Sequence, residues 1–329
     1  MDGPDDDPQF AAACEAHRRA LRLHCYRMTG SFDEAEDLVQ EAMLRAWRAR
    51  ATFEGRAQLT TWLHRIATNV CLDALAERPA RVLPQDVVPA VAHDDEPRST
   101  PPLRPDLPWL QPFPDRALDP ETLVASRESI ELAFMAALQH LPVRQRAILL
   151  LCDVLGWTAK EVAAILELSV AAVTSALQRA HATLGELAPA SRGAWTPLGP
   201  PSDADRAVLA RYMAAWENGD AGALTAMLRD DVRWAMPPAA LWFEGRPAVE
   251  QLFRLFPMRF HGHHRMVAMG ANRQLAAAAY LRAHGAAELR LGGVHVLRLE
   301  GEQIAEITTF SSALCRGFEL PMIFPAAEV

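Results

Sequence analysis

The segment FDEAEDLVQEAMLRAW, Phe32–Trp47, carries apolar residues three and four positions apart, with acidic residues between them. Apolar residues with this spacing form one face of an α-helix. Ser31 and Glu34 have the spacing of a capping box, which starts a helix at this point. The sequence therefore predicts a helix with one buried face and an acidic outer surface. The polar residues on that surface include Asp37, Gln40 and Glu41.

A second helix is predicted for LTTWLHRIATNVCLDAL, Leu59–Leu75. Leu63, Ile66 and Val70 belong to its apolar stripe, so several of its polar residues must project outward. An exposed indole together with hydroxyl groups, an amide and a guanidinium suits the capture of unstacked bases and phosphates. The alternative for the indole of Trp62 is packing in the core.

A helix-turn-helix is predicted for TAKEVAAILELSVAAVTSALQRA, Thr158–Ala180. Thr158 and Glu161 form a capping box for its first helix, and Ser169 is a good N-cap for the second. Outward residues near the start of such a second helix reach base edges in the major groove. The inward residues are predicted to be Val170, Val173, Leu177 and Leu184, and the outward ones Ala171, Ala172, Thr174, Ser175, Gln178 and Arg179.

The order and separation of these segments resemble regions 2 and 4 of bacterial RNA polymerase sigma factors. The similarity is to the sigma-70 family and, within it, to the compact extracytoplasmic-function (ECF) class. The resemblance implies two all-α helical domains that bind core RNA polymerase and promoter DNA. It also implies that Asp37, Gln40 and Glu41 dock on the clamp coiled coil of the largest polymerase subunit. Carboxylates suit this contact because they pair with Arg and Lys on a partner helix.

The resemblance also assigns promoter contacts. For the −10 element, where a base of the non-template strand is flipped out, the matching residues are Arg56, Thr61, Trp62, Arg65, Thr68 and Asn69. For the −35 element they are Ala172, Thr174, Ser175, Gln178 and Arg179. The chain departs from the family pattern at Glu167, where the turn often carries Gly. It departs again at Thr174, Ala176 and His181, where many relatives carry Lys or Arg.

A proline-rich segment separates the two helical regions. Residues 79–125 hold eleven of the 24 prolines, which forbids a regular helix or a central strand. The segment is therefore predicted to be an extended linker or a packed irregular strap. The predicted domains are residues 8–78 for region 2, 79–125 for the Pro-rich linker, 126–188 for region 4 and 203–329 for a third domain.

The third domain is predicted to be α+β. Its first segment, DADRAVLARYMAAWENGD, is an amphipathic helix, and GGVHVLRLEGEQIAEITTF contains two alternating runs joined by a hairpin turn at Gly301. A helix followed by a curved antiparallel sheet makes a cone. The segments YMAAWENGDAGALTAMLRDDVRWAMPP and WFEGRPAVEQLF resemble the SnoaL-like branch of the NTF2-like cone fold.

The cone fold includes isomerases and cyclases that use an Asp base in an apolar pocket. The candidate acid–base groups here are Asp230, Asp231 and His295, and the candidate lining residues are Tyr212, Trp216, Trp234, Met236, Trp242, Phe243 and Phe310. Aromatic residues inside a cone are more commonly core, so the predicted function of this domain is regulation of regions 2 and 4. A small-molecule or protein ligand for it stays open. His261, His263 and His264 lack further ligands at metal spacing and are predicted to lie in an exposed loop.

Composition and charge argue against several other classes of protein. A net charge of −8 on 329 residues argues against a protein that coats nucleic acid by charge alone. The five cysteines form no CxxC pair and indicate reduced thiols. No apolar run is long enough to span a bilayer, and MDGPDDDPQF has no secretion-signal pattern. The prediction is a cytoplasmic protein with no membrane, metal or cofactor, and not an enzyme.

Two alternatives remain. A stand-alone helix-turn-helix regulator would bind operators without polymerase, but it leaves the acidic helix and its Trp-bearing neighbour without a function. An NTF2-like isomerase or cyclase-type enzyme would place its chemistry in the third domain. Binding to core polymerase distinguishes the first alternative, and a pocket carboxylate with a raised pKa would favour the second.

Overall fold

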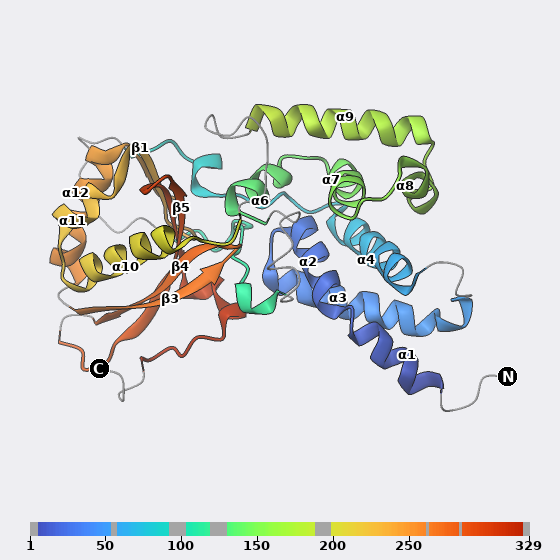
Figure 1. Ribbon diagram of the computed structural model, residues 1–329, viewed down its shortest axis with the longest axis horizontal. Helices are drawn as coiled ribbons and strands as arrows, with labels where there is room; N and C mark the ends of the chain where they lie inside the picture. Colours follow the sequence, from blue (N-terminus) through green and yellow to red (C-terminus); the bar gives the residue numbers. More distant parts are fainter. Residues whose placement is uncertain are drawn as a thin grey trace. The chain divides into compact units, whose positions relative to one another are not determined.

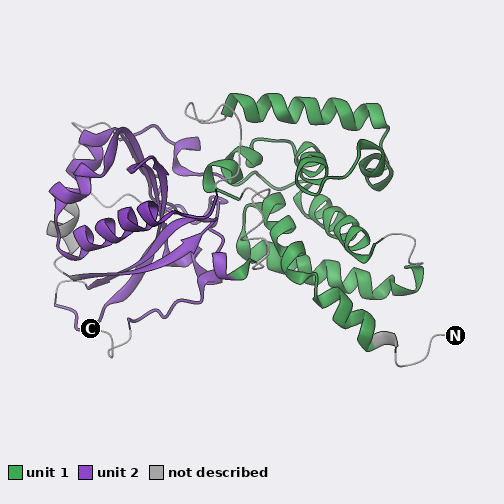
Figure 2. Ribbon diagram, in the orientation of Figure 1, with its two compact units in different colours: residues 1–81, 117–198 green, residues 82–116, 199–329 purple. Residues whose placement is uncertain are grey.

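The computed structural model of the protein describes residues 6–53, 58–91, 103–118, 130–187, 199–260, 263–282 and 285–324. The chain forms two compact units, each built from two separate stretches of sequence (Figure 2). Unit 1 comprises Met1–Arg81 and Ala117–Leu198, and unit 2 comprises Val82–Arg116 and Gly199–Val329. The predicted fold class, with two helical domains followed by an α+β domain, is confirmed.

Helices make up the regular structure of unit 1 in its described residues (Figure 1). They are α1 (Asp6–Glu15), α2 (Arg18–Thr29), α3 (Phe32–Arg48), α4 (Leu59–Leu75), α6 (Leu132–Gln139), α7 (Val143–Leu149), α8 (Ala159–Leu166) and α9 (Val170–Leu187). A 3₁₀ turn, Arg50–Thr52, follows α3, and a π-helical turn, Leu150–Val154, follows α7.

The first half of unit 1 is a helical cluster in which α2, α3 and α4 pack against one another. The buried side of α3 is Ala35, Val39, Ala42 and Ala46, as its spacing predicts. The Ser31 hydroxyl accepts a hydrogen bond from the Glu34 N–H at 3.2 Å, so half of the predicted capping box forms. The Glu34 carboxylate pairs instead with Arg78 and Arg81, at 3.0 and 2.5 Å. These ion pairs connect the residues that follow α4 in the chain to the start of α3.

The second half of unit 1 contains the predicted helix-turn-helix. The chain bends by 107° between α8 and α9, which lies within the usual range for this motif. Thr158 N donates to Glu161 Oε2 at 2.8 Å, and Glu161 N donates to Thr158 Oγ1 at 3.3 Å. Ser169 Oγ accepts from Ala172 N at 3.1 Å. Both predicted start signals are therefore confirmed.

Unit 2 contains a six-stranded sheet with helices against it. Its elements are α10 (Asp203–Glu217), α11 (Ala221–Ala226), β1 (Leu228–Ala235), β2 (Trp242–Glu244), α12 (Arg246–Phe260), β3 (His263–Ala271), β4 (Gln274–Arg282), β5 (Arg290–Glu300) and β6 (Gln303–Ser311). The strand order is β2-β1-β6-β5-β4-β3. All neighbouring pairs are antiparallel except β1 and β6, so the sheet is mixed rather than purely antiparallel as predicted. The helix-containing connection after β1 is long enough to permit the parallel pair.

The sequence patterns of unit 2 match its structure. The predicted face of α10 is buried through Val208, Leu209, Tyr212, Ala215 and Trp216. The helix packs on β3 and β4, while α12 packs on β1 and β2. β5 and β6 form the predicted hairpin, with Gly301 in the turn at a φ of +62°. Glycine adopts that backbone conformation readily because it has no Cβ.

The proline-rich segment belongs to unit 2. We call Val82–Arg116 the strap; its residues 82–91 and 103–116 are described. Val91 forms a parallel bridge with Phe243 of the edge strand β2, and Trp242 Nε1 donates to Val88 O at 2.8 Å. Further along, Arg104 N donates to Pro238 O at 2.9 Å. Of the two arrangements considered for this segment, the described residues form the packed strap.

The strap contains buried apolar side chains and forms backbone bonds to the rest of unit 2. Leu83, Trp109, Leu110 and Phe113 are at most 4% exposed. Trp109 Nε1 also donates to Arg104 O at 2.6 Å, which satisfies the polar atom of the buried indole. Each buried side chain of this size contributes about 1.5–3 kcal/mol when it leaves water. The strap is therefore a structural part of the unit rather than a free connection.

Candidate functional site

The outer face of α3 presents an acidic and apolar surface. Asp37 and Gln40 are exposed, and Glu41 is partly exposed. Leu44 and Trp47 lie on the same helix and are 46% and 37% exposed. Large apolar side chains beside carboxylates on a solvent face are typical of protein-binding surfaces. The structure therefore brings the three predicted polymerase-contacting residues together on one accessible helix.

Glu41 already has a partner within the protein. Its Oε1 lies 2.8 Å from Arg45 Nε, and Arg45 Nη1 lies 2.9 Å from Asp73 Oδ2 on α4. Hydrogen bonds to Asp73 and Glu41 raise the pKa of Arg45. Exposed pairs of this kind contribute only about 0–1 kcal/mol. A cation on a partner protein can therefore replace Arg45 at little cost.

Part of the predicted −10 surface forms a stripe on α4. Thr61, Arg65 and Asn69 are spaced four residues apart, so their side chains are neighbours along one side of the helix. Arg65 and Asn69 are exposed, and Thr61 is partly exposed. The stripe offers a guanidinium, an amide and a hydroxyl group, which can hydrogen-bond phosphates and base edges. Arg56 lies outside the described residues.

Trp62 and Thr68 correct the prediction of an outward surface. Trp62 is 7% exposed, and its ring packs against Phe53 and Phe10 with centroids 5.2 and 6.2 Å away. Thr68 is fully buried; its hydroxyl donates to His64 O at 2.7 Å and lies 2.9 Å from His24 Nε2. Neither side chain can reach DNA in this conformation.

The buried face of α4 is wider than its apolar stripe. Thr68, Cys71 and Leu75 follow one another at positions i, i+3 and i+7, and all three are buried. This spacing allows Thr68 to join the buried face, but the neighbours that cover it, His24 among them, come from another helix. Its hydroxyl group favours the surface, which is where the sequence predicts Thr68.

Arg146 links the two halves of unit 1. This residue of α7 is 3% exposed, and its guanidinium donates to Met28 O at the end of α2. It also donates to Gln139 Oε1 at 2.8 Å and to the carbonyls of Gln139 and Leu141, at 3.1 and 3.2 Å. Carbonyl oxygens at helix C-termini carry partial negative charge and can compensate part of the cost of burying a cation. Burial nevertheless lowers the pKa of Arg146 to about 10.

An aromatic contact adds to this link. The rings of Trp157, before α8, and His64, on α4, have centroids 6.2 Å apart. His64 in turn packs edge-on against His24 of α2, at 5.4 Å. The pKa of His24 lies well below its usual value because burial and the neighbouring His64 and Arg27 disfavour its charged form. The two halves therefore meet through a desolvated guanidinium and packed aromatic rings.

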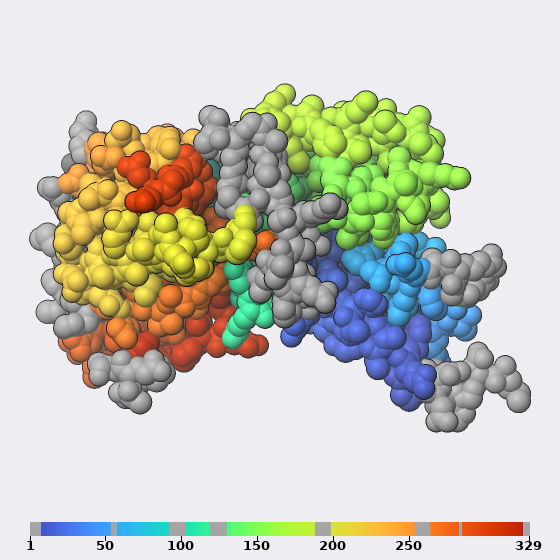
Figure 3. Space-filling model, in the orientation of Figure 1, coloured from blue at the N-terminus to red at the C-terminus, as the bar shows by residue number. Residues whose placement is uncertain are grey.

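The second helix of the helix-turn-helix presents its predicted outward face. This face is open to solvent along α9, which lies on the surface in Figure 3. The exposed residues include all five predicted for the −35 element, Ala172, Thr174, Ser175, Gln178 and Arg179. Val170 was predicted to face inward, but it is 48% exposed because it begins the helix beyond the hydrophobic cluster. The start of α9 therefore offers methyl groups beside hydroxyl and amide groups.

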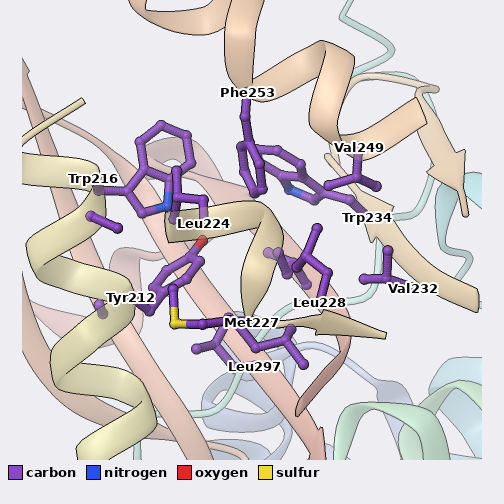
Figure 4. Close-up of a cluster of buried hydrophobic side chains, with 14 of the residues drawn as sticks. Tyr212, Trp216, Leu224, Met227, Leu228, Val232, Trp234, Val249, Phe253 and Leu297 are labelled. Carbon is purple, nitrogen blue, oxygen red and sulfur yellow. The ribbon is translucent and has the colours of Figure 1, made fainter. Parts of the chain in front are cut away.

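The interior of unit 2 is filled with aromatic side chains. Trp216 packs against Trp234 and Phe253, with ring centroids 6.0 and 5.5 Å apart (Figure 4). Tyr212 Oη lies 2.8 Å from His295 Nδ1, and both residues are buried. Burial, with a smaller contribution from His264, lowers the pKa of His295 to about 3. His295 is therefore neutral near pH 7.

The carboxylates considered for pocket chemistry lie on the surface instead. The side chains of Asp230 and Asp231 are 93% and 70% exposed. Asp230 pairs with Arg246 at 3.0 Å, and Asp231 pairs with Arg229 at 2.8 Å. The Arg229 hydrogen bond lowers the pKa of Asp231. The expectation that these groups lie beside the apolar interior is wrong, because β1 is irregular between Leu228 and Arg233 and both side chains face solvent there.

The histidine cluster also differs from its prediction. His263 and His264 belong to β3 rather than to an exposed loop, and the ring of His264 lies 5.3 Å from that of Trp216. His261 lies outside the described residues. Among the residues that the structure describes, no group of three or more His, Cys, Asp or Glu side chains is arranged to hold a metal. The five cysteines are free; four are buried, and Cys152 is partly exposed.

Within the described segments, no single helix has both the length and the apolar composition needed to cross a membrane. The bent pair α8 and α9 meets those two criteria only when its helices are counted together.

Three family descriptions match the chain in sequence. Sigma-70 region 2 matches residues 14–80, Sigma-70 region 4 matches residues 131–184, and the SnoaL-like domain matches residues 209–307. The fold and its exposed surfaces thus belong to a sigma factor with an additional cone domain.

Individual relatives agree with this class. The chain is 44% identical to the ECF RNA polymerase sigma factor SigG of Mycobacterium tuberculosis over 267 residues, which cover 80% of this chain and 71% of that protein. It is 32% identical to SigM of the same organism over 171 residues, covering 52% and 72%. The crystal structure of the M. tuberculosis sigma factor SigJ shares the fold, with a TM-score of 0.59, 21% identity and coverage of 94% and 99%. The chain belongs to the ECF RNA polymerase sigma factors, which bind core RNA polymerase and direct it to promoter DNA.

Proposed function

We propose that this sigma factor docks on core polymerase through the α3 face and contacts promoter DNA through α4 and α9. The α3 face is Asp37, Gln40, Glu41 and Leu44. The stripe Thr61, Arg65 and Asn69 binds the strand-separated −10 element, and the outward residues of α9 bind the −35 duplex. The protein acts in the cytoplasm and catalyses no reaction itself. The observation that carries the proposal is the accessible acidic face beside an accessible polar stripe within one unit.

The −35 contact is proposed to depend on few charges. Gln178 can form a bidentate bond to adenine, Arg179 can bind guanine or phosphate, and Ala172 can contact a thymine methyl group. Negative charge also lies beside this helix, since the Asp153 carboxylate is 2.6 Å from His181 Nε2. Weak electrostatics suit a domain that is brought to DNA by polymerase rather than by its own charge.

The cone domain is proposed to regulate rather than to catalyse. Its interior is packed with the rings of Trp216, Trp234 and Phe253, and its surface carboxylates are held in ion pairs. A general base must reach the proton that it removes, and Asp230 and Asp231 do not face the interior. The domain instead binds the segment that connects regions 2 and 4.

A binding experiment tests the polymerase contact. Reversing charge with Asp37→Arg and Glu41→Arg together should weaken binding to core polymerase about tenfold or more, because two charge pairs become repulsive. The measurement is a titration of labelled sigma factor with core enzyme. The control carries Glu186→Arg and Glu302→Arg, which change the net charge equally at exposed sites on other elements than α3. Equal affinity of the two variants would refute the proposed docking face.

A further inference from the structure

The outer face of α9 begins with apolar side chains. Val170 is 48% exposed, and Ala171 and Ala172 beside it are exposed as well. Val173 and Ala176 are buried in the hydrophobic cluster of the helix-turn-helix, so the exposed residues lie on the sides of α9 that turn away from this cluster. The first two turns of the helix therefore offer methyl groups to a partner.

Two hydroxyl groups at this end of the motif are bonded to the backbone. Ser169 Oγ accepts a hydrogen bond from Ala172 N at 3.1 Å, and Thr174 Oγ1 donates to Val170 O at 3.0 Å. The hydroxyl proton of Thr174 is therefore used within the helix, although the side chain is exposed. The methyl group on the same Cβ is then the part of Thr174 that suits an apolar contact.

The same stretch of α9 carries no charge. Residues 170–178, VAAVTSALQ, contain no Lys, Arg, Asp or Glu, and the first cation of the helix is Arg179. Thr174 occupies one of the positions where many relatives carry Lys or Arg. Arg or Lys bound to O6 and N7 of guanine is the commonest specific contact in the major groove. The first two turns of α9 have no side chain for that contact.

Three exposed residues of α9 form a row along the helix. Val170, Thr174 and Gln178 are spaced four residues apart, so their side chains are neighbours on one side. Gln is suited to a bidentate bond with adenine, and apolar groups are suited to contact with the 5-methyl group of thymine. Adenine and thymine are the two bases of one pair. The row therefore matches A·T pairs rather than G·C pairs.

We propose that Val170 and Thr174 determine the specificity of the −35 contact by reading the 5-methyl groups of two thymines in the major groove. Outward residues near the start of the second helix of this motif reach base edges there. The −35 element of this sigma factor accordingly has A·T pairs at the positions that Val170 and Thr174 face. The inference rests on the proposed function, because it requires α9 to occupy the −35 duplex.

Helix geometry sets the distance between the two thymines. Val170 and Thr174 are four residues apart, which is about 6 Å along the helix axis at 1.5 Å per residue. Successive base pairs of B-DNA are about 3.4 Å apart. The two thymines are therefore expected within about two base-pair steps of each other, on the same strand or on opposite strands.

The expected size of each contact follows from the apolar area of a methyl group. Burying one such group contributes about as much as one CH₂, which corresponds to about fourfold in a binding constant. Two independent contacts should together contribute about fifteenfold.

Replacement of single bases tests the proposal with the holoenzyme. Core polymerase carrying the full chain first selects promoters from a library that is randomised across the −35 element. Each thymine of the selected element is then replaced by deoxyuridine, which removes the 5-methyl group and keeps the hydrogen-bonding groups of the base. Replacements at two positions, about two steps apart or less, should each weaken promoter binding about fourfold. Thymines of the spacer, replaced in the same way, are the control and should not change the affinity.

Variants of the two residues assign each methyl group to its base. Val170→Ser should lose the preference for thymine over uracil at one position. Thr174→Ser, which keeps the hydroxyl group bonded to Val170 O, should lose the preference at the other position. The matched variants Val170→Ile and Thr174→Val keep methyl groups at the contact and should keep the preference, whatever their overall affinity. Because each variant is compared with itself on two DNAs, changes in its folding or polymerase binding cancel.

The outcomes distinguish this inference from the proposed function. A selected −35 element without thymine, or equal binding of the thymine and uracil duplexes, would overturn the reading of methyl groups. A preference for thymine that persists in both serine variants would overturn its assignment to Val170 and Thr174. Failure of the unmodified chain to bind core polymerase, or of the holoenzyme to select any −35 sequence, would instead refute the proposed function.

Discussion

At the scale of single residues, Glu167 occupies a turn position where the family often has Gly, and its backbone is strained there. It ends α8 with a φ of +54°, in the left-handed region where the turn of this motif often carries Gly. A residue with a Cβ is disfavoured there by roughly 1–2 kcal/mol. Since Glu167 is exposed, the structure offers no packing that would compensate the strain.

Replacing this residue should stabilise unit 1. Glu167→Gly is expected to increase the free energy of unfolding by about 1 kcal/mol, because glycine relieves the strain and its extra freedom in the unfolded chain offsets only part of the gain. Thermal unfolding should shift upward by about 2–4 °C. Glu167→Ala keeps the Cβ and should give no comparable gain. A Tm unchanged by the glycine would show that the turn carries no such strain.

At the scale of elements, the aromatic interior of unit 2 depends on a neutral imidazole. His295 of β5 lies among Tyr212, Trp216 and Trp234, with ring centroids 5.5–6.4 Å away. Its pKa of about 3 is below the value of about 6.5 expected in the unfolded chain. The unfolded state therefore binds a proton more readily than the folded state. This contribution to stability is complete above about pH 6.5 and is lost as pH falls toward 3.

Acid titration tests this dependence. Between pH 6.5 and pH 5 the protein should lose about 1.6 kcal/mol of stability through His295, because the slope rises toward 1.36 kcal/mol per pH unit below the unfolded pKa. His295→Gln cannot titrate and should show a smaller loss over the same interval, whatever its stability at pH 7. Urea unfolding followed by tryptophan fluorescence at both pH values gives the difference. His140→Gln, at an exposed histidine, should retain the full loss; an equal loss in both variants would contradict the assignment.

Residue spacing predicted the features that lie within single elements. The buried side of α3, the capping signals of α8 and α9 and the β5–β6 hairpin follow from residue spacing, because each depends on neighbours within one element. The burial of Trp62 and Thr68 depends on other parts of the chain. Phe10 and Phe53 cover Trp62, and His24 lies against Thr68. Spacing within α4 could not show which neighbours would cover them.

At the scale of the whole molecule, the chain passes between the two units three times, after Arg81, Arg116 and Leu198. The cone domain is therefore joined to the sigma regions by the strap as well as by its own N-terminal connection. A deletion that starts at Asp203 removes the partner of the strap but leaves the strap itself. Phe113 would then lose the hairpin to which its backbone is bonded.

This topology predicts two different deletion phenotypes. Removal of residues 203–329 alone should give a protein that associates or aggregates, because large apolar side chains become exposed. Replacing residues 82–116 by a polar linker of equal length in the same deletion should restore a monodisperse protein. Size-exclusion chromatography distinguishes them, and the second variant is the suitable one for measuring transcription without the cone domain. Monodisperse behaviour of the simple deletion would argue against a strap that needs the cone.

The sequence by itself determined the elements and their class: helices from spacing and caps, the helix-turn-helix from its turn, the cone from its helix and hairpin, and the accessible acids of α3. These follow from interactions between residues close together in the chain. Only the tertiary structure decided that the strap belongs to unit 2, that Asp230 and Asp231 face solvent, and that Arg146 joins the two halves of unit 1. Each of these depends on hydrogen bonds, ion pairs and burial between distant segments, which local spacing does not encode.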